Sequence, residues 1–397
     1  MNEFIIPDYI KEIINLLKEN GFEAYLVGGS VRDFLMGRIP DDLDMTTSAT
    51  PDEMLSVFSD YKVIKTGLKH GTITVFVDKS PVEITTYRID GEYLDNRHPS
   101  EVIFTRNLHE DLKRRDFTIN AMAYNEDGLV DYCGGAEDIS ERIIRAVGEP
   151  DKRFEEDALR ILRALRFSSV LCFDIEKHTE KSARKNAKLL KKISAERILV
   201  ELNKLFIGKN AKEVVVEYSD ILSEISPELF HNVKKKFKDL SLYPHSLFVI
   251  YAILMNHLSA FEAEEVMSFL KFSNADKKSV LSLLWLLRQD IPKSKAELKL
   301  LISETGFDAF EYYFEYLDSM GEDTAPLKEY FKEVTENNEC CFISNLAING
   351  NDLSALGIKD GKKIGEILRA LLLTVIDEKA ENTHESLINY VINNYLA

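Results

Sequence analysis

The sequence predicts an α+β protein in which a small mixed sheet comes first and an all-helical remainder follows. Short apolar segments rich in β-branched residues are concentrated before residue 132, among them TITVFV and VEITTYR. Beyond about residue 136, apolar residues recur with the 3.6-residue period of amphipathic helices, and strand signals are nearly absent. The chain has 397 residues, which is too long for one ordinary domain. We therefore expect a mixed-sheet unit followed by several helical ones.

The first expected elements are a helix, a strand and a second, short helix. Residues 8–20 have an amphipathic helical pattern that Gly21 ends. The segment EAYLVGG is a short apolar strand followed by a glycine turn, and SVRDFLMG is a short helix. Ser30 is the expected N-cap of that helix, and Gly37 lies just after its end.

Three further strands complete the expected sheet. DLDMTT, residues 42–47, is the first, and TITVFV and VEITTYR follow it. The residues DKSP between the last two strands suit a hairpin turn. Residues 22–132 therefore form a mixed α/β unit.

The helical part begins with a long amphipathic segment, EPDKRFEEDALRILRALRFSSVL. It has Pro150 near its start and continues with a helical period, so we expect one helix here. Further helical patterns fill residues 177–334, and TENNECCFISN interrupts them before a last helical unit.

Composition excludes several classes of protein. No apolar run reaches the ~18 residues that a membrane span needs, and the N-terminal segment MNEFIIPDYIKEII lacks the basic region of a signal peptide. No C-x-x-C pair occurs among the cysteines, which argues against a disulfide framework and a zinc site. We expect a cytoplasmic protein with no membrane partner. The cysteines are Cys133, Cys172, Cys340 and Cys341.

The formal net charge is −17, which by itself speaks against a non-specific nucleic-acid binder. Residues 177–192, which we call the basic strip, are an exception, with seven Lys or Arg against one Glu. A solvated helix face is the favoured interpretation of the basic strip, and a local phosphate-binding surface is the alternative.

A pair of aspartates indicates metal chemistry. In a strand, Asp42 and Asp44 point to one face, and Glu83 joins them if its strand is adjacent. Carboxylates held this close repel each other unless a cation neutralises them. Mg²⁺ prefers oxygen ligands and shares them with substrate phosphates, and two such ions can promote an in-line displacement. Taken alone, such a pair is more often a solvated turn.

A potential anion site precedes these aspartates. Gly28 and Gly29 follow an apolar strand and precede a helix, so their backbone N–H groups and the helix N-terminus can bind phosphate. Arg32 adds a guanidinium one turn later. An ordinary strand-to-helix turn is the commoner role of such glycines. An anion site followed by an acidic pair nevertheless indicates a site for a nucleoside triphosphate and its metal ions.

The segment LVGGSVRDFLMG…DDLDMTTSAT resembles the catalytic signature of the polymerase-β-like nucleotidyltransferases. The resemblance is to the class that contains tRNA CCA-adding enzymes and bacterial poly(A) polymerases. Later segments resemble further motifs of this class, in the same order. They are DLKRRDFTINAMAY (ribose recognition), LVDYCGGAEDI (hinge), RFEEDALRILRALRF (base recognition), ISAERILVELNKLF (its brace) and the tail segment LAINGNDLSALGIKDGKKIGEIL.

The resemblance implies an activity and a division of the chain. The implied activity is template-independent addition of C, C and A to the 3′ end of tRNA from CTP and ATP, with release of pyrophosphate. It implies tRNA as the partner and no obligate protein partner. The implied parts are a catalytic head (1–135), a helical neck that recognises the base (136–206), a helical body (207–334) and a tRNA-binding tail (335–397).

Roles for individual residues also follow from the resemblance. The catalytic carboxylates are Asp42, Asp44 and Glu83, of which the first two bind Mg²⁺. The nucleotide-binding residues are Gly28, Gly29, Arg32, Arg115, Asp116, Asp157, Arg160, Arg163 and Arg166. The candidate tRNA contacts are Lys188, Lys191, Lys362 and Lys363.

The chemistry of the base-recognition segment agrees with these roles. A carboxylate only accepts hydrogen bonds and a guanidinium only donates them. Cytosine and adenine offer an amino donor beside a ring-nitrogen acceptor, whereas uracil and guanine present the reverse. Asp157 and Arg160 would therefore accept C and A and reject U and G. Ion pairs on a helix surface are the alternative. The expected buried stripe consists of Phe154, Ala158, Ile161, Leu162 and Leu165.

A polar segment, DGEYLDNRHPSEV (90–102), indicates which nucleotides the enzyme adds to tRNA. It resembles the loop that supports the switch from C to A in this family. Its presence favours full CCA addition over CC-only addition, A-only addition or poly(A) synthesis. A catalytically silent RNA-binding protein is the alternative from another class. His245 and His257 belong to no adjacent His-Asp pair, so no metal-dependent phosphatase is expected.

Overall fold

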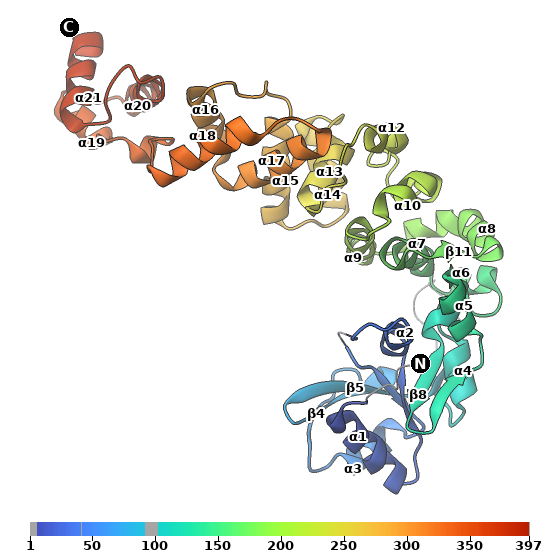
Figure 1. Cartoon of the computed structure of the whole chain (residues 1–397). Helices are drawn as coiled ribbons and strands as arrows, with labels where there is room; N and C mark the ends of the chain where they lie inside the picture. Colours follow the sequence, from blue (N-terminus) through green and yellow to red (C-terminus); the bar gives the residue numbers. More distant parts are fainter. Residues whose placement is uncertain (1–5, 41, 92–101, 397) are drawn as a thin grey trace. The chain divides into compact units, whose positions relative to one another are not determined.

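The computed structural model describes residues 6–40, 42–91 and 102–396 and confirms the α+β class (Figure 1). The chain divides into two compact units, Met1–Phe230 and His231–Ala397. The first contains the sheet and the second is helical. All four cysteines are free thiols. In the described part of the chain, no helix combines the length and apolar character that crossing a membrane requires.

The first unit is built on a mixed sheet of seven strands in the order β3-β4-β5-β2-β1-β8-β9. Neighbouring strands are antiparallel except for β2 and β5, which are parallel and place Met45 beside Ile84. The strands are β1 (Ala24–Val27), β2 (Met45–Thr47), β3 (Lys62–Ile64), β4 (Thr72–Val77), β5 (Ser80–Thr86), β8 (Met122–Asn125) and β9 (Gly128–Asp131). Two residues, Asp78 and Lys79, make the expected hairpin turn, both with positive φ.

Helices cover this sheet. The apolar face of α1 buries Ile10, Ile13 and Leu17 in the same core as strands β1, β4 and β5. The helices before residue 145 are α1 (Asp8–Glu19), α2 (Gly29–Leu35), α3 (Pro51–Val57), α4 (Leu108–Lys113) and α5 (Gly135–Glu141). A separate hairpin pairs β6 (Arg88–Asp90) with β7 (Val102–Phe104).

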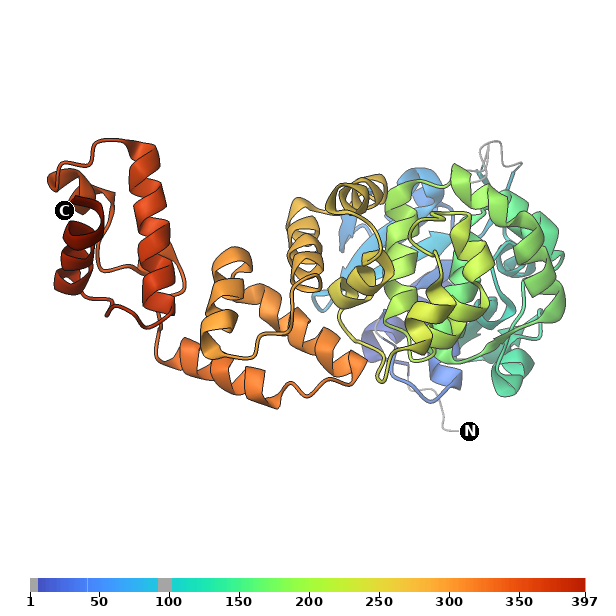
Figure 2. The same ribbon diagram turned by 90° about the horizontal axis from the view of Figure 1, so that it is seen from above.

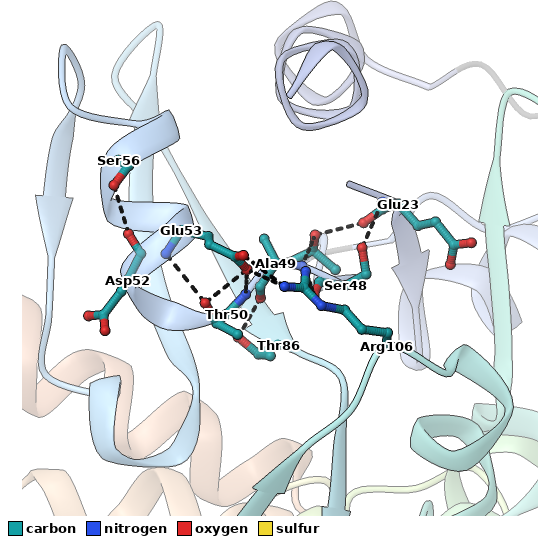
Figure 3. Close-up of polar contacts among 10 residues, drawn as sticks. Glu23, Ser48, Ala49, Thr50, Asp52, Glu53, Ser56, Thr86 and Arg106 are labelled. Carbon is teal, nitrogen blue, oxygen red and sulfur yellow. Dashed lines mark hydrogen bonds and ion pairs between the residues drawn. The ribbon is translucent and has the colours of Figure 1, made fainter. Parts of the chain in front are cut away.

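Arg106 joins this hairpin to α3 (Figure 3). Its guanidinium donates to the Ser48 carbonyl at 2.6 Å and to both Glu53 carboxylate oxygens at 2.7 and 2.8 Å. Glu53 also completes a capping box with Thr50 at the start of α3. The Arg106 hydrogen bond, together with those from Thr50, lowers the pKa of Glu53 to about 2.

Two local expectations were wrong near the glycine turn. Strand β2 begins at Met45, so Asp42 and Asp44 lie just before it. Ser30 is not an N-cap, because α2 begins at Gly29 and Gly28 occupies the cap. Gly28 turns the chain directly after β1 with a φ of 74°, and the Ser30 hydroxyl donates to the Val27 carbonyl instead.

The segment expected to be one long helix is two. Helix α6 (Pro150–Glu156) ends before Asp157, whose backbone is extended, and α7 (Leu159–Leu171) follows. The Asp157 carboxylate accepts a hydrogen bond from the Leu159 N–H, and such local bonds compete with helical hydrogen bonding. The predicted buried stripe is confirmed: Phe154, Ala158, Ile161, Leu162 and Leu165 are all fully buried.

Helices fill the rest of both units, apart from the two-residue strands β10 (Ile143–Ile144) and β11 (Asp174–Ile175). Helix α9 packs along α7. The remaining elements of the first unit are α8 (Lys177–Asn186), the 3₁₀ segment η3 (Ala187–Lys192), α9 (Ala195–Phe206), α10 (Ala211–Glu217) and α11 (Ser219–Ser223).

In the second unit, the last three helices, red in Figure 2, share one core around Leu353, Leu371 and Leu387. The helices of this unit are α12 (Val233–Lys238), α13 (Leu247–Met255), α14 (Ala260–Phe269), α15 (Asn274–Leu286), α16 (Lys295–Thr305), α17 (Asp308–Met320), α18 (Ala325–Glu336), α19 (Gly350–Ala355), α20 (Gly361–Ile376) and α21 (His384–Val391).

Candidate nucleotidyl-transfer site

The glycine turn brings two arginines over the start of α2. A Cβ added to Gly28 would lie 3.3 Å from Nη1 of Arg115, and one added to Gly29 would lie 3.4 Å from Nη2 of Arg32. Both guanidiniums therefore approach backbone that has no side chain in the way. This arrangement agrees with the predicted anion site.

The three candidate carboxylates lie near the start of β2, with Glu83 in the middle of the neighbouring strand β5. The parallel register places Glu83 and Asp44 one residue before the Met45–Ile84 pair. The Val27 N–H donates to the Asp44 carbonyl at 3.0 Å, which fixes Asp44 beside the end of β1. All three side chains are exposed, including that of Asp42.

Negative charge accumulates around the start of β2. Desolvation raises the pKa of Asp44, and so do the like charges of Glu83 and Asp42, while Arg115 opposes them. Such a donor set fits a divalent cation, which would stabilise the ionised carboxylates. Across residues 6–40, 42–91 and 102–396, however, no group of three or more His, Cys, Asp or Glu side chains has metal-binding geometry. Glu83 as a third ligand stays a prediction.

Arg115 is held by a buried carboxylate. Asp111 is fully buried and pairs with Nη2 of Arg115 at 3.3 Å and with Arg114 at 2.8 Å. Burial lowers the pKa of Arg115 and Asp111 raises it. Nε of Arg115 is buried and has no hydrogen-bond acceptor among the residues that the structure describes. A buried donor in that state favours an incoming anion.

A polar chain connects α2 to α7. Arg32 donates to Asn120 at 2.9 Å, and Asn120 donates to Asp116 at 3.2 Å. Asp116 also accepts from Arg163 at 2.8 Å. Burial alone would raise the pKa of Asp116, but Arg163 and Arg160 lower it to about 2. Asp116 is therefore an ionised, positioned group. Sequence reasoning missed Asn120, although it lies within the quoted segment DLKRRDFTINAMAY.

Phe167 is a second group that sequence reasoning did not single out. The guanidinium carbons of Arg32, Arg163 and Arg166 lie 5.3, 5.3 and 4.1 Å from its ring centroid. Glu201 of α9 pairs with Arg166 at 2.9 Å and with Arg163 at 3.7 Å. One aromatic ring and one carboxylate thus gather three cations from two elements. The sequence signal for this part of the site was the Arg-x-x-Arg spacing, which did not single out Phe167.

Asp157 and Arg160 each have their own partner. Asp157 pairs with Arg197 of α9 at 2.7 Å, because the break between α6 and α7 directs its carboxylate there. Arg160 is buried, pairs with Glu156 at 2.8 Å and donates to the Arg114 carbonyl at 3.0 Å. The structure therefore does not join the two in a hydrogen bond, and their joint reading of a base stays a prediction.

The basic strip is partly neutralised within the protein, since at least three of its seven cations form ion pairs. Arg184 pairs with Asp220, Lys185 with Asp151, and Lys191 with Glu224 at 2.9 Å. These pairs agree with the favoured interpretation, a solvated and ion-paired face. Lys188 is exposed.

The candidate tail contacts lie in the first turn of α20. Lys362 and Lys363 are exposed there, and the Asp360 carboxylate accepts from the Lys362 N–H at 3.0 Å. Of the predicted loop at 90–102, residues 92–101 lie outside the described residues.

Three family models match this chain. The Poly A polymerase head domain matches residues 24–145, the probable RNA and SrmB-binding site of polymerase A matches 172–231, and the putative tRNA nucleotidyltransferase domain 2 matches 245–391. The CCA-adding enzyme of Staphylococcus haemolyticus is 37% identical over 396 residues, which cover 97% of each chain. This chain belongs to the family of CCA-adding enzymes.

Other members of the CCA-adding family agree. The enzyme of Lactobacillus delbrueckii subsp. bulgaricus is 38% identical and covers 96% of each chain. The crystal structure of the Bacillus stearothermophilus CCA-adding enzyme in complex with CTP has a TM-score of 0.79 at 32% identity, covering 98% of both chains. A Thermotoga maritima CCA-adding enzyme complexed with tRNA has a TM-score of 0.68 at 23% identity, which shows the shared fold. Membership confirms the predicted enzyme class and implies a divalent metal ion.

Proposed function

We propose that this enzyme adds C, C and A stepwise to the 3′ end of tRNA, using CTP and ATP without a nucleic-acid template. The observation that carries the proposal is the pair of exposed aspartates beside the arginine-covered glycine turn, in a chain that matches CCA-adding enzymes over nearly its whole length. The 3′-hydroxyl of tRNA attacks the α-phosphorus and pyrophosphate leaves. We also propose that the protein works in the cytoplasm.

Asp42 and Asp44 are the proposed metal ligands, and Mg²⁺ is the proposed ion because their oxygens are hard donors. When bound, the ion supplies neutralisation of the phosphate and activation of the attacking hydroxyl. The residues of the chain do the rest. Arg32 and Arg115 hold the triphosphate over the glycine turn, because both guanidiniums already approach it. Asp116, held by Arg163 and Asn120, positions the ribose.

Base selection is the proposed role of Asp157 and Arg160. Oδ1 of Asp157 accepts from the Leu159 N–H and Oδ2 accepts from Arg197, and a carboxylate oxygen can accept more than one hydrogen bond. Nη2 of Arg160 uses one of its two N–H groups for the Arg114 carbonyl. Both therefore keep capacity for a base that presents a donor beside an acceptor, as cytosine and adenine do.

The division into head (1–135), neck (136–206), body (207–334) and tail (335–397) is our proposal for how functions are distributed. The nucleotide site then lies in the head and neck, and tRNA binding extends into the tail through Lys362 and Lys363. Lys188 of the neck is a further proposed contact, whereas Lys191 already pairs with Glu224.

The test is incorporation on three tRNAs, ending before the first C, after the first C and after the second C. We expect stepwise addition that stops at CCA in the presence of both CTP and ATP. Arrest after CC, addition of A alone or a long A tail would each replace this proposal by the corresponding narrower activity.

The Asp42→Ala variant separates catalysis from binding. We expect loss of incorporation while tRNA affinity stays at the wild-type value, because Asp42 is exposed and lies outside the buried core. Chelation of divalent ions with EDTA should have the same effect on the wild-type enzyme. Incorporation that survives both treatments would contradict a metal-dependent mechanism at this pair.

A further inference from the structure

Helix α12, Val233–Lys238, has an outer face made only of lysines. Its sequence is VKKKFK, and Val233 and Phe237 are buried against the rest of the second unit. Lys234, Lys235 and Lys238 are exposed. At 100° per residue these three positions lie within about 100° of one another on the helix. They therefore form one surface, which we call the α12 face.

The α12 face lacks acidic partners. Within the described residues, no carboxylate forms an ion pair with Lys234, Lys235 or Lys238, and the nearest acid in sequence is the exposed Asp239 after the helix. The basic strip is compensated in part, because Arg184, Lys185 and Lys191 each pair with an acid. On a chain of net charge −17, an uncompensated cluster of lysines needs a physical reason.

The edge of the α12 face adds further basic groups. Lys236 is half-buried and donates to the Leu254 carbonyl at 2.6 Å, near the C-terminal end of α13. Its Nζ lies 3.0 Å from Nδ1 of His257, whose ring stacks on that of His231 with centroids 5.3 Å apart. Desolvation lowers the pKa of Lys236 to about 8. An anion nearby would favour the charged form of Lys236.

We propose that the α12 face binds the phosphate backbone of the tRNA substrate. Residues 232–244 lie between the two matched family regions, 172–231 and 245–391, so no family model assigns this helix a role. Closely spaced lysines without acidic partners suit a polyanion. Each lysine that neutralises a phosphate releases a counterion from the nucleic acid, and this release favours binding. The inference rests on the proposed function, which supplies an RNA as the partner.

The test compares two double charge reversals in the full-length enzyme. K234E/K235E changes the α12 face, and K278E/K293E makes the same charge change at exposed lysines elsewhere in the second unit. We expect K234E/K235E to weaken binding of tRNA lacking CCA roughly tenfold at low salt, and to reduce the slope of log K against log salt by about two, since each lost phosphate contact removes about 0.9. K278E/K293E should leave both close to wild type.

Steady-state kinetics provide a second readout. K234E/K235E should raise KM for tRNA and leave KM for CTP and kcat unchanged, because α12 holds none of the proposed nucleotide or metal ligands. If melting by circular dichroism shows that this variant is unfolded, the neutral K234Q/K235Q/K238Q variant replaces it, with the same expected direction. If K234E/K235E has the same slope of log K against log salt as K278E/K293E, and the wild type adds CCA, the inference about the α12 face is overturned. Absence of addition by the wild type would instead contradict the proposed function.

Discussion

At the scale of the residue, the site depends on how each ionised group is held. Asp116 is the clearest case, because Arg163 and Asn120 both donate to its carboxylate. Asp157 depends on Arg197 in the same way. Charged groups fixed by partners need little reorganisation when a nucleotide arrives, which is the basis of electrostatic preorganisation.

Base discrimination should depend on Asp157 and Arg160. We expect Asp157→Ala or Arg160→Ala to raise incorporation of UMP or GMP relative to CMP by roughly tenfold or more, because unpaired buried groups no longer penalise the wrong bases. Competition assays with all four nucleoside triphosphates measure this ratio. Unchanged discrimination in both variants would remove the pair from base recognition.

Sugar selection should depend on Asp116. The Asp116→Asn variant keeps the shape of the side chain and removes its charge, so we expect a smaller preference for CTP over dCTP. The ratio of kcat/KM for the two nucleotides is the measurement. A ratio equal to that of the wild type would show that Asp116 only supports the structure.

The lowered pKa of Asp116 also predicts that the stability of the protein depends on pH. Its pKa is about 2 in the folded protein against 3.8 ordinarily, so the folded state binds fewer protons and is favoured above pH 3.8. This contribution, about 2 kcal/mol, is lost as pH falls through 3.8 to 2. Urea unfolding of the wild type and Asp116→Asn should show a difference in unfolding free energy that shrinks over this window. If the difference in unfolding free energy stayed constant over this pH range, it would contradict the lowered pKa of Asp116.

At the scale of the element, the turn between β1 and α2 sets the anion site. Gly28 takes a φ of 74° and lets Arg115 approach, and Gly21 takes a φ of 83° with no atom near its Cβ position. The two glycines share a positive φ and differ in what surrounds them, so Gly21 serves as a control for Gly28.

We expect Gly28→Ala and Gly21→Ala each to lower the unfolding free energy by about 1 kcal/mol through backbone strain. Only Gly28→Ala should also raise KM for CTP and ATP, because its methyl group would lie 3.3 Å from Nη1 of Arg115. Chemical unfolding and steady-state kinetics give the two values. Equal effects of both variants on KM would mean that strain alone, and not the position of Arg115, controls nucleotide binding.

At the scale of the whole molecule, the chain forms two compact units that meet in sequence at residues 230 and 231. Each has its own buried core, for example around Ile13 and Leu26 in the first unit and around Leu353 and Leu371 in the second. Separate cores allow separate unfolding. We expect the calorimetric enthalpy of unfolding to exceed the van 't Hoff enthalpy. Equality of the two would show that the units unfold as one.

The sequence by itself determined the α+β class, the strands β1, β4 and β5, and the identities of the candidate residues. Periodicity reports which face of an element is buried, so the stripe of α6 and α7 was predicted correctly. The segment motifs also indicated the family correctly, because several long motifs in one order are a specific signal.

Only the tertiary structure decided which charged groups meet. The spacing of Asp157 and Arg160 suggested one helix, but α6 ends at Glu156, and the extended Asp157 pairs with Arg197 of α9. Asn120 and Glu201 entered the site because long-range packing placed them beside the arginines, and the same packing brought Arg32 to the ring of Phe167. A pattern of spacing describes one element at a time, whereas partners across elements depend on how those elements pack.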